Sequence, residues 1–491
     1  MLFNSYEFIF FFLPTTFLIY FWLNKKRLTQ ASKAWMVFAS LFFYAWWNTI
    51  YLPLILGSIL FNFSIGSTIS QIENIESTLN KKVSRKSILI FGLASNILLL
   101  GYFKYMDFFI TNANTVTGSS FSLMHIILPL GISFFTFTQI AYLIDAYRNE
   151  IKEMDYLNYT LFVTFFPHLL AGPILHHKEM MPQFNSLKSK VLNYQNIASG
   201  IFLFSIGLFK KVVIADTFAQ WANPGFETTH ALNLIEAWAT SFSYTFQLYF
   251  DFSGYTDMAL AIAFMFNIKL PINFNSPYKA KNIQDFWRRW HITLSRFLRD
   301  YVYIPLGGNR DGECRTYFNL FTVFVIGGLW HGASWMFIFW GVLHGSAIVI
   351  HRIWHQFGQK MNTALAWFIT LNFINITWIF FRAKDWSQAK NILNGMLGYN
   401  GIMFPEKYAQ YFGSHTNSLI QFGTVFENIH GSPKTTLYII GAFILTLIFK
   451  NSMEQLNNFK STHINFLFSL ILFTTAVSMM SQVSEFLYFN F

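Results

Sequence analysis

The stretch "YEFIFFFLPTTFLIYFWLNKKR", residues 6–27, decides the fold class of this chain. Residues 6–24 are mostly apolar, and the run is close to the ~20 residues that a helix needs to cross a bilayer. Three basic residues follow it directly. Because no basic segment precedes the run and no small-residue cleavage site follows it, we predict a retained membrane helix rather than a cleaved signal peptide.

Comparable apolar runs recur along the chain. The composition agrees, because 54% of the residues are hydrophobic and 12% are charged, against roughly 25% charged in a soluble domain. Segments 159–175 and 234–266 are also apolar but contain Pro, Gly, His or Asp, which predicts broken or re-entrant helices. We therefore predict an all-α, polytopic integral membrane protein, a single transmembrane domain over residues 1–491 with roughly 10–13 passes. The other candidate spans are 35–50, 52–70, 87–103, 124–146, 198–216, 318–341, 364–381, 436–449 and 464–482.

The formal charge of +11 comes mainly from basic residues in short loops between the predicted spans. This distribution follows the positive-inside rule of membrane proteins and does not require nucleic-acid binding. Basic groups at 25–27 and 81–86 follow the first and third predicted spans, so we expect the N-terminus outside. The segment 279–315, itself rich in basic residues, is expected in the cytoplasm. The single cysteine, Cys314, excludes an internal disulfide framework and a cysteine-rich metal site.

The segment 279–315 is the densest basic run of the chain. Within it, apolar residues recur at helical spacing from Ile283 to Tyr301, which predicts an amphipathic helix at the membrane interface, with His291 near the edge of its apolar face. Such a helix could equally be a surface anchor with no part in chemistry. The apolar positions are Phe286, Trp290, Leu294, Phe297 and Leu298.

Two histidines, His331 and His344, lie in the apolar stretch "GGLWHGASWMFIFWGVLHG", residues 327–345. An ionisable residue at membrane depth needs a partner or a function, because burial of an unpaired polar group is costly. The glycines of "GGLWHG" would let a substrate or another backbone approach His331 closely. A hydrogen-bonded structural histidine is the alternative for each of them.

The stretch "FQLYFDFSGYTDMA", residues 246–259, places Asp251, Ser253 and Asp257 in another apolar region. Two carboxylates there need counter-charges, and Arg288 and Arg289 are the nearest basic candidates in sequence. We favour a packing network that pins helices together, with an indirect role in orienting a histidine.

Several enzyme classes lack their motifs. The chain has no G-x-S-x-G nucleophile elbow, no H-E-x-x-H metalloprotease motif, no P-loop and no dinucleotide-binding fingerprint. His351 and His355 in "HRIWH" have the spacing of metal ligands but lie at the basic end of a predicted span, so we predict no metal site.

Ten motifs together resemble the membrane-bound O-acyltransferase family, and within it most closely the alginate O-acetylase (AlgI) branch. They follow the family's order, cover nearly the whole chain and are specific as a set. They are "FFYAWWN", "LGYFKYMDFF", "LPLGISFF", "YLIDAYR", "FFPHLLAGPI", "LFKKVVIAD", "FQLYFDFSGYTDMA", "FWRRWHITLSRFLRDYVYIPLGGNR", "GGLWHGASW" and "FFRAKDWSQA".

The resemblance implies a reaction and its residues. Members of the family move an acyl group from an activated cytoplasmic donor to an acceptor hydroxyl, and the two family histidines match His331 and His291. His331 would then be the general base, a task suited to an imidazole whose unperturbed pKa is ~6.5. Supporting or channel positions would be Asp251, Ser253, Asp257, Trp330, Arg288 and Arg289, and Arg296 and Arg299 would complete a basic cluster that attracts the donor phosphates.

The resemblance also sets expectations for ligands and location. They are no bound cofactor, acetyl-CoA or another acyl thioester as the donor, a polysaccharide such as alginate as the acceptor, and relay to a periplasmic acetyltransferase partner. The chain would lie in a bacterial inner membrane with a periplasmic N-terminus, as part of alginate or other exopolysaccharide biosynthesis. Peptidoglycan O-acetylation and D-alanyl transfer to teichoic acids remain alternatives, and a polytopic transporter or flippase is the alternative from another class.

Overall fold

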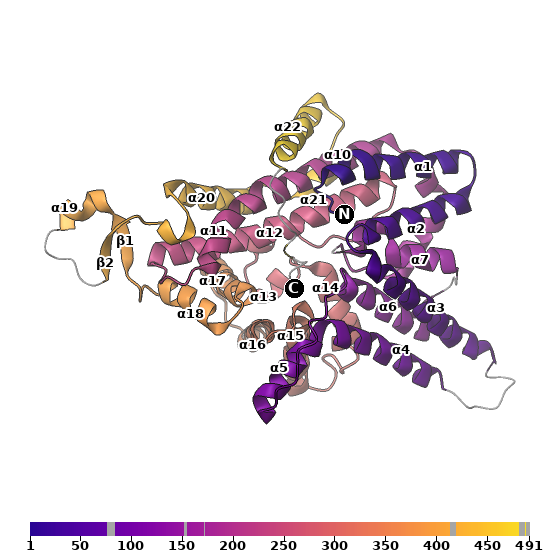
Figure 1. Ribbon diagram of the computed structural model, residues 1–491, viewed down its shortest axis with the longest axis horizontal. Helices are drawn as coiled ribbons and strands as arrows, with labels where there is room; N and C mark the ends of the chain where they lie inside the picture. Colours follow the sequence, from indigo (N-terminus) through magenta and orange to yellow (C-terminus); the bar gives the residue numbers. More distant parts are fainter. Residues whose placement is uncertain (76–83, 152–154, 171, 413–418, 481–486, 488–491) are drawn as a thin grey trace. The chain divides into compact units, whose positions relative to one another are not determined.

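The computed structural model describes residues 1–491 except 76–83, 152–154, 171, 413–418, 481–486 and 488–491. Helices make up nearly all of the regular secondary structure in the described chain, which confirms the predicted all-α class (Figure 1). It forms two compact units, each made of several chain segments, and they are described separately. Unit 1 comprises residues 1–205, 255–272 and 459–471, and unit 2 comprises 206–254, 273–458 and 472–491. The prediction of a single domain over 1–491 stays a prediction.

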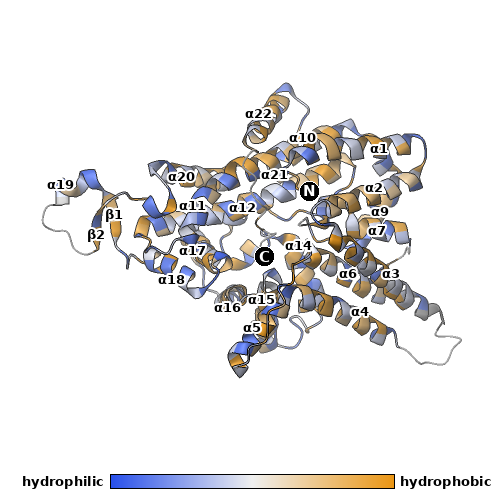
Figure 2. Ribbon diagram, in the orientation of Figure 1, coloured by the Kyte–Doolittle hydropathy of each residue, from blue (hydrophilic) through white to orange (hydrophobic). Residues whose placement is uncertain are grey.

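Six helical stretches within the described residues are long and apolar enough to span a membrane, and two shorter apolar helices accompany them. Hydrophobic residues run along helices such as α1 and α10, as Figure 2 shows. The six stretches are Phe8–Lys25, Thr49–Gln71, Arg85–Thr117, Tyr194–Glu227, Trp335–Gln356 and Thr363–Arg382, and the shorter helices are Pro433–Leu447 and His463–Met479. The protein is therefore a multi-pass membrane protein, whereas the predicted number of passes stays a prediction.

Unit 1 is a helical assembly with an aromatic and amide-rich interior. Asn62 on α3, Asn96 on α4 and Gln139 on α6 exchange side-chain hydrogen bonds, which joins three apolar helices through polar groups. Its helices are α1 (Leu13–Lys25), α2 (Thr29–Ala45), α3 (Leu52–Ile75), α4 (Arg85–Leu100), α5 (Met106–Thr117), α6 (Ile132–Tyr147), α7 (Tyr156–Thr164), α8 (Phe166–Leu169) and α9 (His177–Asn185). The predicted break within 159–175 is present, because the chain is non-helical at Phe165 and again over residues 173–176.

Three helices contribute residues to both units. They are α10 (Tyr194–Phe209), α12 (Leu234–Met265) and α22 (His463–Met479). The predicted interruption of 234–266 is wrong, since α12 is one continuous helix of 32 residues. A single helical glycine and paired polar side chains do not break a helix, and Gly254 instead serves close packing, because a Cβ there would lie 2.7 Å from the Gly207 carbonyl oxygen.

Unit 2 contains the remaining elements, including a small two-stranded sheet. Strands β1 (Ile402–Pro405) and β2 (Ile420–Gly423) are parallel, with Ile402 opposite Ile420. Its other helices are α11 (Asp216–Glu227), α13 (Ile283–Trp287), α14 (Ile292–Leu298), α15 (Glu313–His331), α16 (Trp335–Gln356), α17 (Thr363–Arg382), α18 (Trp386–Met396), α19 (Ala409–Phe412), α20 (Pro433–Leu447) and α21 (Ser452–Asn457).

The hairpin of α15 and α16 is a close helix pair in unit 2. A Cβ on Gly328 would lie 2.3 Å from the Phe337 carbonyl oxygen, and one on Gly341 would lie 2.5 Å from that of Phe324. Glycine is therefore needed at both positions for the two backbones to touch. The predicted span 318–341 is wrong as one helix, because α15 ends at His331 and α16 begins at Trp335 after an extended Gly332 and the helix-capping Ser334.

Candidate active site

His331 is the last residue of α15, and its imidazole is surrounded by aromatic rings. The ring centroids of Trp330, Trp340 and Phe381 lie 5.0, 5.2 and 5.0 Å from that of His331. The side chain is buried, with 5% of its surface exposed. The glycine-rich "GGLWHG" thus brings a second helix against α15 and places His331 at the turn between them.

His291 lies at a sharp turn between α13 and α14, where its φ of 43° falls in the left-handed region. Backbone hydrogen bonds hold the turn, since the Ile292 N–H donates to the Asn273 carbonyl and the Asn275 N–H donates to that of Arg289. The predicted continuous amphipathic helix from Ile283 to Tyr301 is therefore wrong. All five predicted apolar positions are buried inside the protein, so this segment packs from several sides and bends at His291.

The structure brings the two predicted histidines together. Their ring centroids are 6.5 Å apart, and the Trp330 ring lies 6.3 Å from His291. His291 is 1% exposed and meets the edge of Phe252 on α12 at a centroid distance of 4.9 Å. Burial lowers the pKa of His291 to about 3, so this imidazole is neutral at physiological pH.

A cavity of about 590 Å³ extends from His331 along α16. His331 and Trp340 line one end, and Arg352 and His355 line the other. The 12 residues from Trp340 to Arg352 rise ~18 Å along a helix, which gives the length of the path. Its other lining residues include Gln284, Trp287, Ser295, Arg299, Tyr303, Gly327, His351 and Gln356. A polar, basic mouth thus leads to a largely aromatic inner end.

The predicted basic cluster is divided by the structure. Arg299 lines the cavity and pairs with Asp300 at 2.7 Å. Arg288, Arg289 and Arg296 are not among its lining residues.

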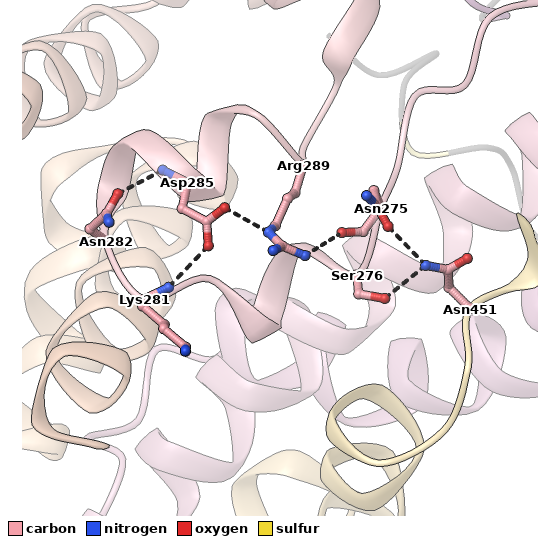
Figure 3. Close-up of polar contacts among 7 residues, drawn as sticks. All are labelled: Asn275, Ser276, Lys281, Asn282, Asp285, Arg289 and Asn451. Carbon is pink, nitrogen blue, oxygen red and sulfur yellow. Dashed lines mark hydrogen bonds and ion pairs between the residues drawn. The ribbon is translucent and has the colours of Figure 1, made fainter. Parts of the chain in front are cut away.

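Arg289 serves the local fold. Figure 3 shows its guanidinium between the carboxylate of Asp285, at 2.8 Å, and the carbonyl of Asn275, at 3.3 Å. Asn451 completes the network by donating to Asn275 and Ser276 (Figure 3).

Asp251 has a counter-charge that differs from the predicted one. The ammonium of Lys211 lies 2.7 Å from one Asp251 oxygen, so neither Arg288 nor Arg289 is needed for that carboxylate. A lysine inside the apolar run 198–216 was the sequence signal for this pair. Ser253 is buried in unit 2, whereas Asp257 is buried in unit 1.

His344 has a hydrogen-bond partner on each ring nitrogen. Trp287 Nε1–H donates to Nδ1 at 3.1 Å, and Nε2 lies 3.1 Å from the Thr377 hydroxyl, which itself donates to the Ile374 carbonyl. The hydroxyl therefore accepts from Nε2–H, which fixes the tautomer. These contacts agree with the alternative of a hydrogen-bonded structural histidine for His344.

Sequence reasoning did not assign Tyr303, His351, Arg352 and His355 to the site, although all of them line the cavity. His351 and His355 drew notice only for metal-ligand spacing, and on α16 their i, i+4 spacing instead places both along the cavity wall. Arg352 is anchored by Glu313, with nitrogen–oxygen distances of 3.0 and 2.9 Å.

Comparisons with known proteins show which enzymes this chain is similar to. Over its full length the chain is 49% identical to the peptidoglycan O-acetyltransferase of Helicobacter pylori, covering 98% of that protein. It is 39% identical to a probable alginate O-acetylase AlgI of Pseudomonas aeruginosa, over 81% of this chain and 75% of that one. The teichoic acid D-alanyltransferase of Streptococcus thermophilus is 28% identical over 51% of this chain and 68% of its own length.

These relatives correct the expected branch of the family and support the expected class of enzyme. The chain was expected to be most similar to the alginate O-acetylases. The peptidoglycan O-acetyltransferase is more similar to it and matches along the whole chain, so only membership of the shared family is supported. The transporter alternative has no support among them, since all three are named as acyl-transfer enzymes. Residues 8–384 match the MBOAT family, so this chain belongs to the membrane-bound O-acyltransferases.

Proposed function

We propose that this O-acyltransferase moves acetyl groups from a cytoplasmic thioester, acetyl-CoA as the first candidate, through the bacterial inner membrane for O-acetylation of peptidoglycan. The observation that carries the chemistry is the position of His331 at the inner end of a cavity whose other end is polar and basic. The full-length likeness to a peptidoglycan O-acetyltransferase supports the acceptor.

His331 is the general base in this proposal. It removes the proton of an acceptor hydroxyl as the hydroxyl oxygen attacks the thioester carbonyl. A new carbon–oxygen ester bond forms, the carbon–sulfur bond breaks, and the proton passes to the departing thiolate. The aromatic rings around His331 exclude water, which protects the thioester from hydrolysis.

The cavity is the route of the donor. Arg299 belongs to the basic segment 279–315, which the positive-inside rule assigns to the cytoplasm, so the mouth that Arg299 and Arg352 line faces that side. Both guanidiniums can attract donor phosphates. The ~18 Å between the levels of Arg352 and Trp340 suits a donor whose phosphates and reactive sulfur are far apart.

Alginate O-acetylation is the second candidate, supported by the 39% identity to a probable alginate O-acetylase. Both candidates share the donor and the role of His331 and differ in the acceptor. In both, the acetyl group could pass to a periplasmic acetyltransferase partner before it reaches the polymer.

The test is transfer of labelled acetyl groups in membranes that contain wild type, His331→Ala, His291→Ala or His463→Ala. His463 is an exposed histidine at the start of α22 and serves as the matched control. Radiolabelled acetyl-CoA is supplied with peptidoglycan or alginate and with periplasmic extract, and ester-linked label is counted. We expect label in peptidoglycan with wild type and with His463→Ala, and loss with His331→Ala. Label in alginate alone would favour the second candidate, and full transfer by His331→Ala would overturn the role of His331.

A further inference from the structure

Unit 2 contains a buried ion pair between Lys211 and Asp251. The residue that follows Asp251 in the chain, Phe252, contacts His291. Lys211 belongs to a π-helical turn, Lys210–Ala215, that joins α10 to α11, and its side chain is 2% exposed. Its ammonium lies 2.7 Å from an Asp251 oxygen and 3.0 Å from an Asp216 oxygen. Turns of this type are rare and occur often at functional sites.

The ion pair fixes α12 from one side. Asp251 is 1% exposed, and its second oxygen accepts a hydrogen bond from the Leu487 N–H at 3.1 Å. At Gly254, a Cβ would lie 3.0 Å from the Lys211 backbone nitrogen, so the two helical segments touch at the level of the ion pair. Rotation or sliding of α12 would separate a buried lysine from its carboxylate, which is strongly unfavourable.

The next residue of α12 contacts His291. Successive residues of an α-helix differ by ~100° in direction, so Asp251 and Phe252 point to different sides of α12. The Phe252 ring meets His291 edge-on at a centroid distance of 4.9 Å and an interplanar angle of 81°. It also packs edge-on against Phe274 at 4.9 Å, which holds the ring itself in place.

We infer that the Lys211–Asp251 ion pair is a positioning device that holds Phe252, and through it His291, in place beside His331. That His291 lies near the reacting groups rests on the proposed function, in which His331 is the general base, because the two rings are 6.5 Å apart. Lys211 and Asp251 are positioning residues, since neither is among the residues that line the cavity. The inference predicts that the pair controls the turnover step and the packing of His291 while leaving donor binding unchanged.

The test replaces both charges of the Lys211–Asp251 pair, so that neither is left buried without the other, while Asp216 keeps its charge and its side chain is 13% exposed. We compare wild type, Lys211→Met/Asp251→Asn and Phe252→Leu in detergent. Each is treated with diethyl pyrocarbonate, and the labelling of each histidine is measured by mass spectrometry. His344, held by two hydrogen bonds, reports global opening, and exposed His463 reports reagent activity.

We expect His291 to be labelled at least five-fold faster in both variants than in wild type, with His344 still protected. In the transfer assay, kcat should fall at least ten-fold and the KM for acetyl-CoA should change less than two-fold. Equal protection of His291 in all three proteins would overturn the inference, and so would simultaneous exposure of His344 in both variants, which indicates general destabilisation. The labelling requires no acetyl transfer, so failure of the proposed function in the assay leaves this result readable.

Discussion

Two histidines of one short stretch, His331 and His344, differ in what surrounds them. Both are buried, at 5% and 0% exposed. His344 sits inside α16 with each ring nitrogen engaged by another side chain. His331 ends α15 and forms part of the wall of a cavity with a basic mouth.

The difference teaches how a buried histidine can be assigned. Burial alone is the same for a structural and a catalytic group, because both must leave water. A tautomer fixed by two side chains, as in His344, leaves no free lone pair to accept a proton from a substrate. Access from a cavity, as for His331, is what a general base requires. The following predictions test whether this difference decides function.

The largest effect is expected for His331→Gln. Glutamine keeps most of the side-chain volume but cannot act as a base, so acetyl transfer should fall ~1,000-fold, within the usual contribution of general base catalysis. The rate per folded protein in the labelled acetyl-CoA assay measures this. The matched variant is His344→Gln, which should keep at least half of the wild-type rate per folded protein. Equal losses of the transfer rate in the two variants would contradict the difference in function between His331 and His344.

His344→Gln should instead lower stability. The substitution removes a ring that bonds to Trp287 and Thr377 and packs 4.6 Å from the Trp340 ring. Disruption of buried hydrogen bonds costs ~1–3 kcal/mol, which thermal unfolding in detergent would report as a lower Tm. His331→Gln should have a Tm closer to that of wild type. A reversed order of the two Tm values would contradict the structural role of His344.

The sequence predicted much of this site, for identifiable physical reasons. The two family histidines were found by motif, and the structure places their rings 6.5 Å apart although 40 residues (331 − 291) separate them in the chain. The prediction of one continuous helix over 283–301 failed, because helical spacing identifies buried apolar positions but not a bend in the backbone. Backbone hydrogen bonds to Asn273 and Asn275 hold that bend at His291. Such a bend depends on contacts between segments that are distant in sequence.

Charge partners were the least predictable feature. Proximity in sequence suggested Arg288 and Arg289 for Asp251, whereas the structure pairs it with Lys211, 40 residues (251 − 211) away. Arg289 is bound to Asp285, its i, i+4 neighbour in a local turn. A buried lysine is costly without carboxylates, so Lys211 in an apolar run was the better guide to the partner of Asp251.

A smaller effect is expected for Trp287→Phe. Phenylalanine keeps an aromatic ring at the cavity wall but removes the Nε1–H that binds His344 Nδ1. Stability should fall by ~1–2 kcal/mol, because a buried acceptor loses its donor, and the KM for acetyl-CoA should change less than two-fold. Combining Trp287→Phe with His344→Gln should cost less than the sum of the two, since they share one hydrogen bond. Strict additivity in Tm-derived free energies would argue against that bond.

The smallest effect is expected for Arg299→Gln, which tests whether the cavity beside His331 is the route of the donor. Arg299 lines the mouth but is well exposed, with 61% of its side-chain surface accessible, so salt in solution weakens its attraction for a phosphate. We expect the KM for acetyl-CoA to rise ~3-fold at low salt, with kcat unchanged and the difference reduced at high salt. The matched control is Arg289→Gln, which removes a charge of the same segment that pairs with Asp285 away from the cavity. An equal rise in KM for Arg289→Gln would mean that the donor responds to the total charge of the segment, and the cavity that distinguishes His331 from His344 would then lose its assignment as the donor route.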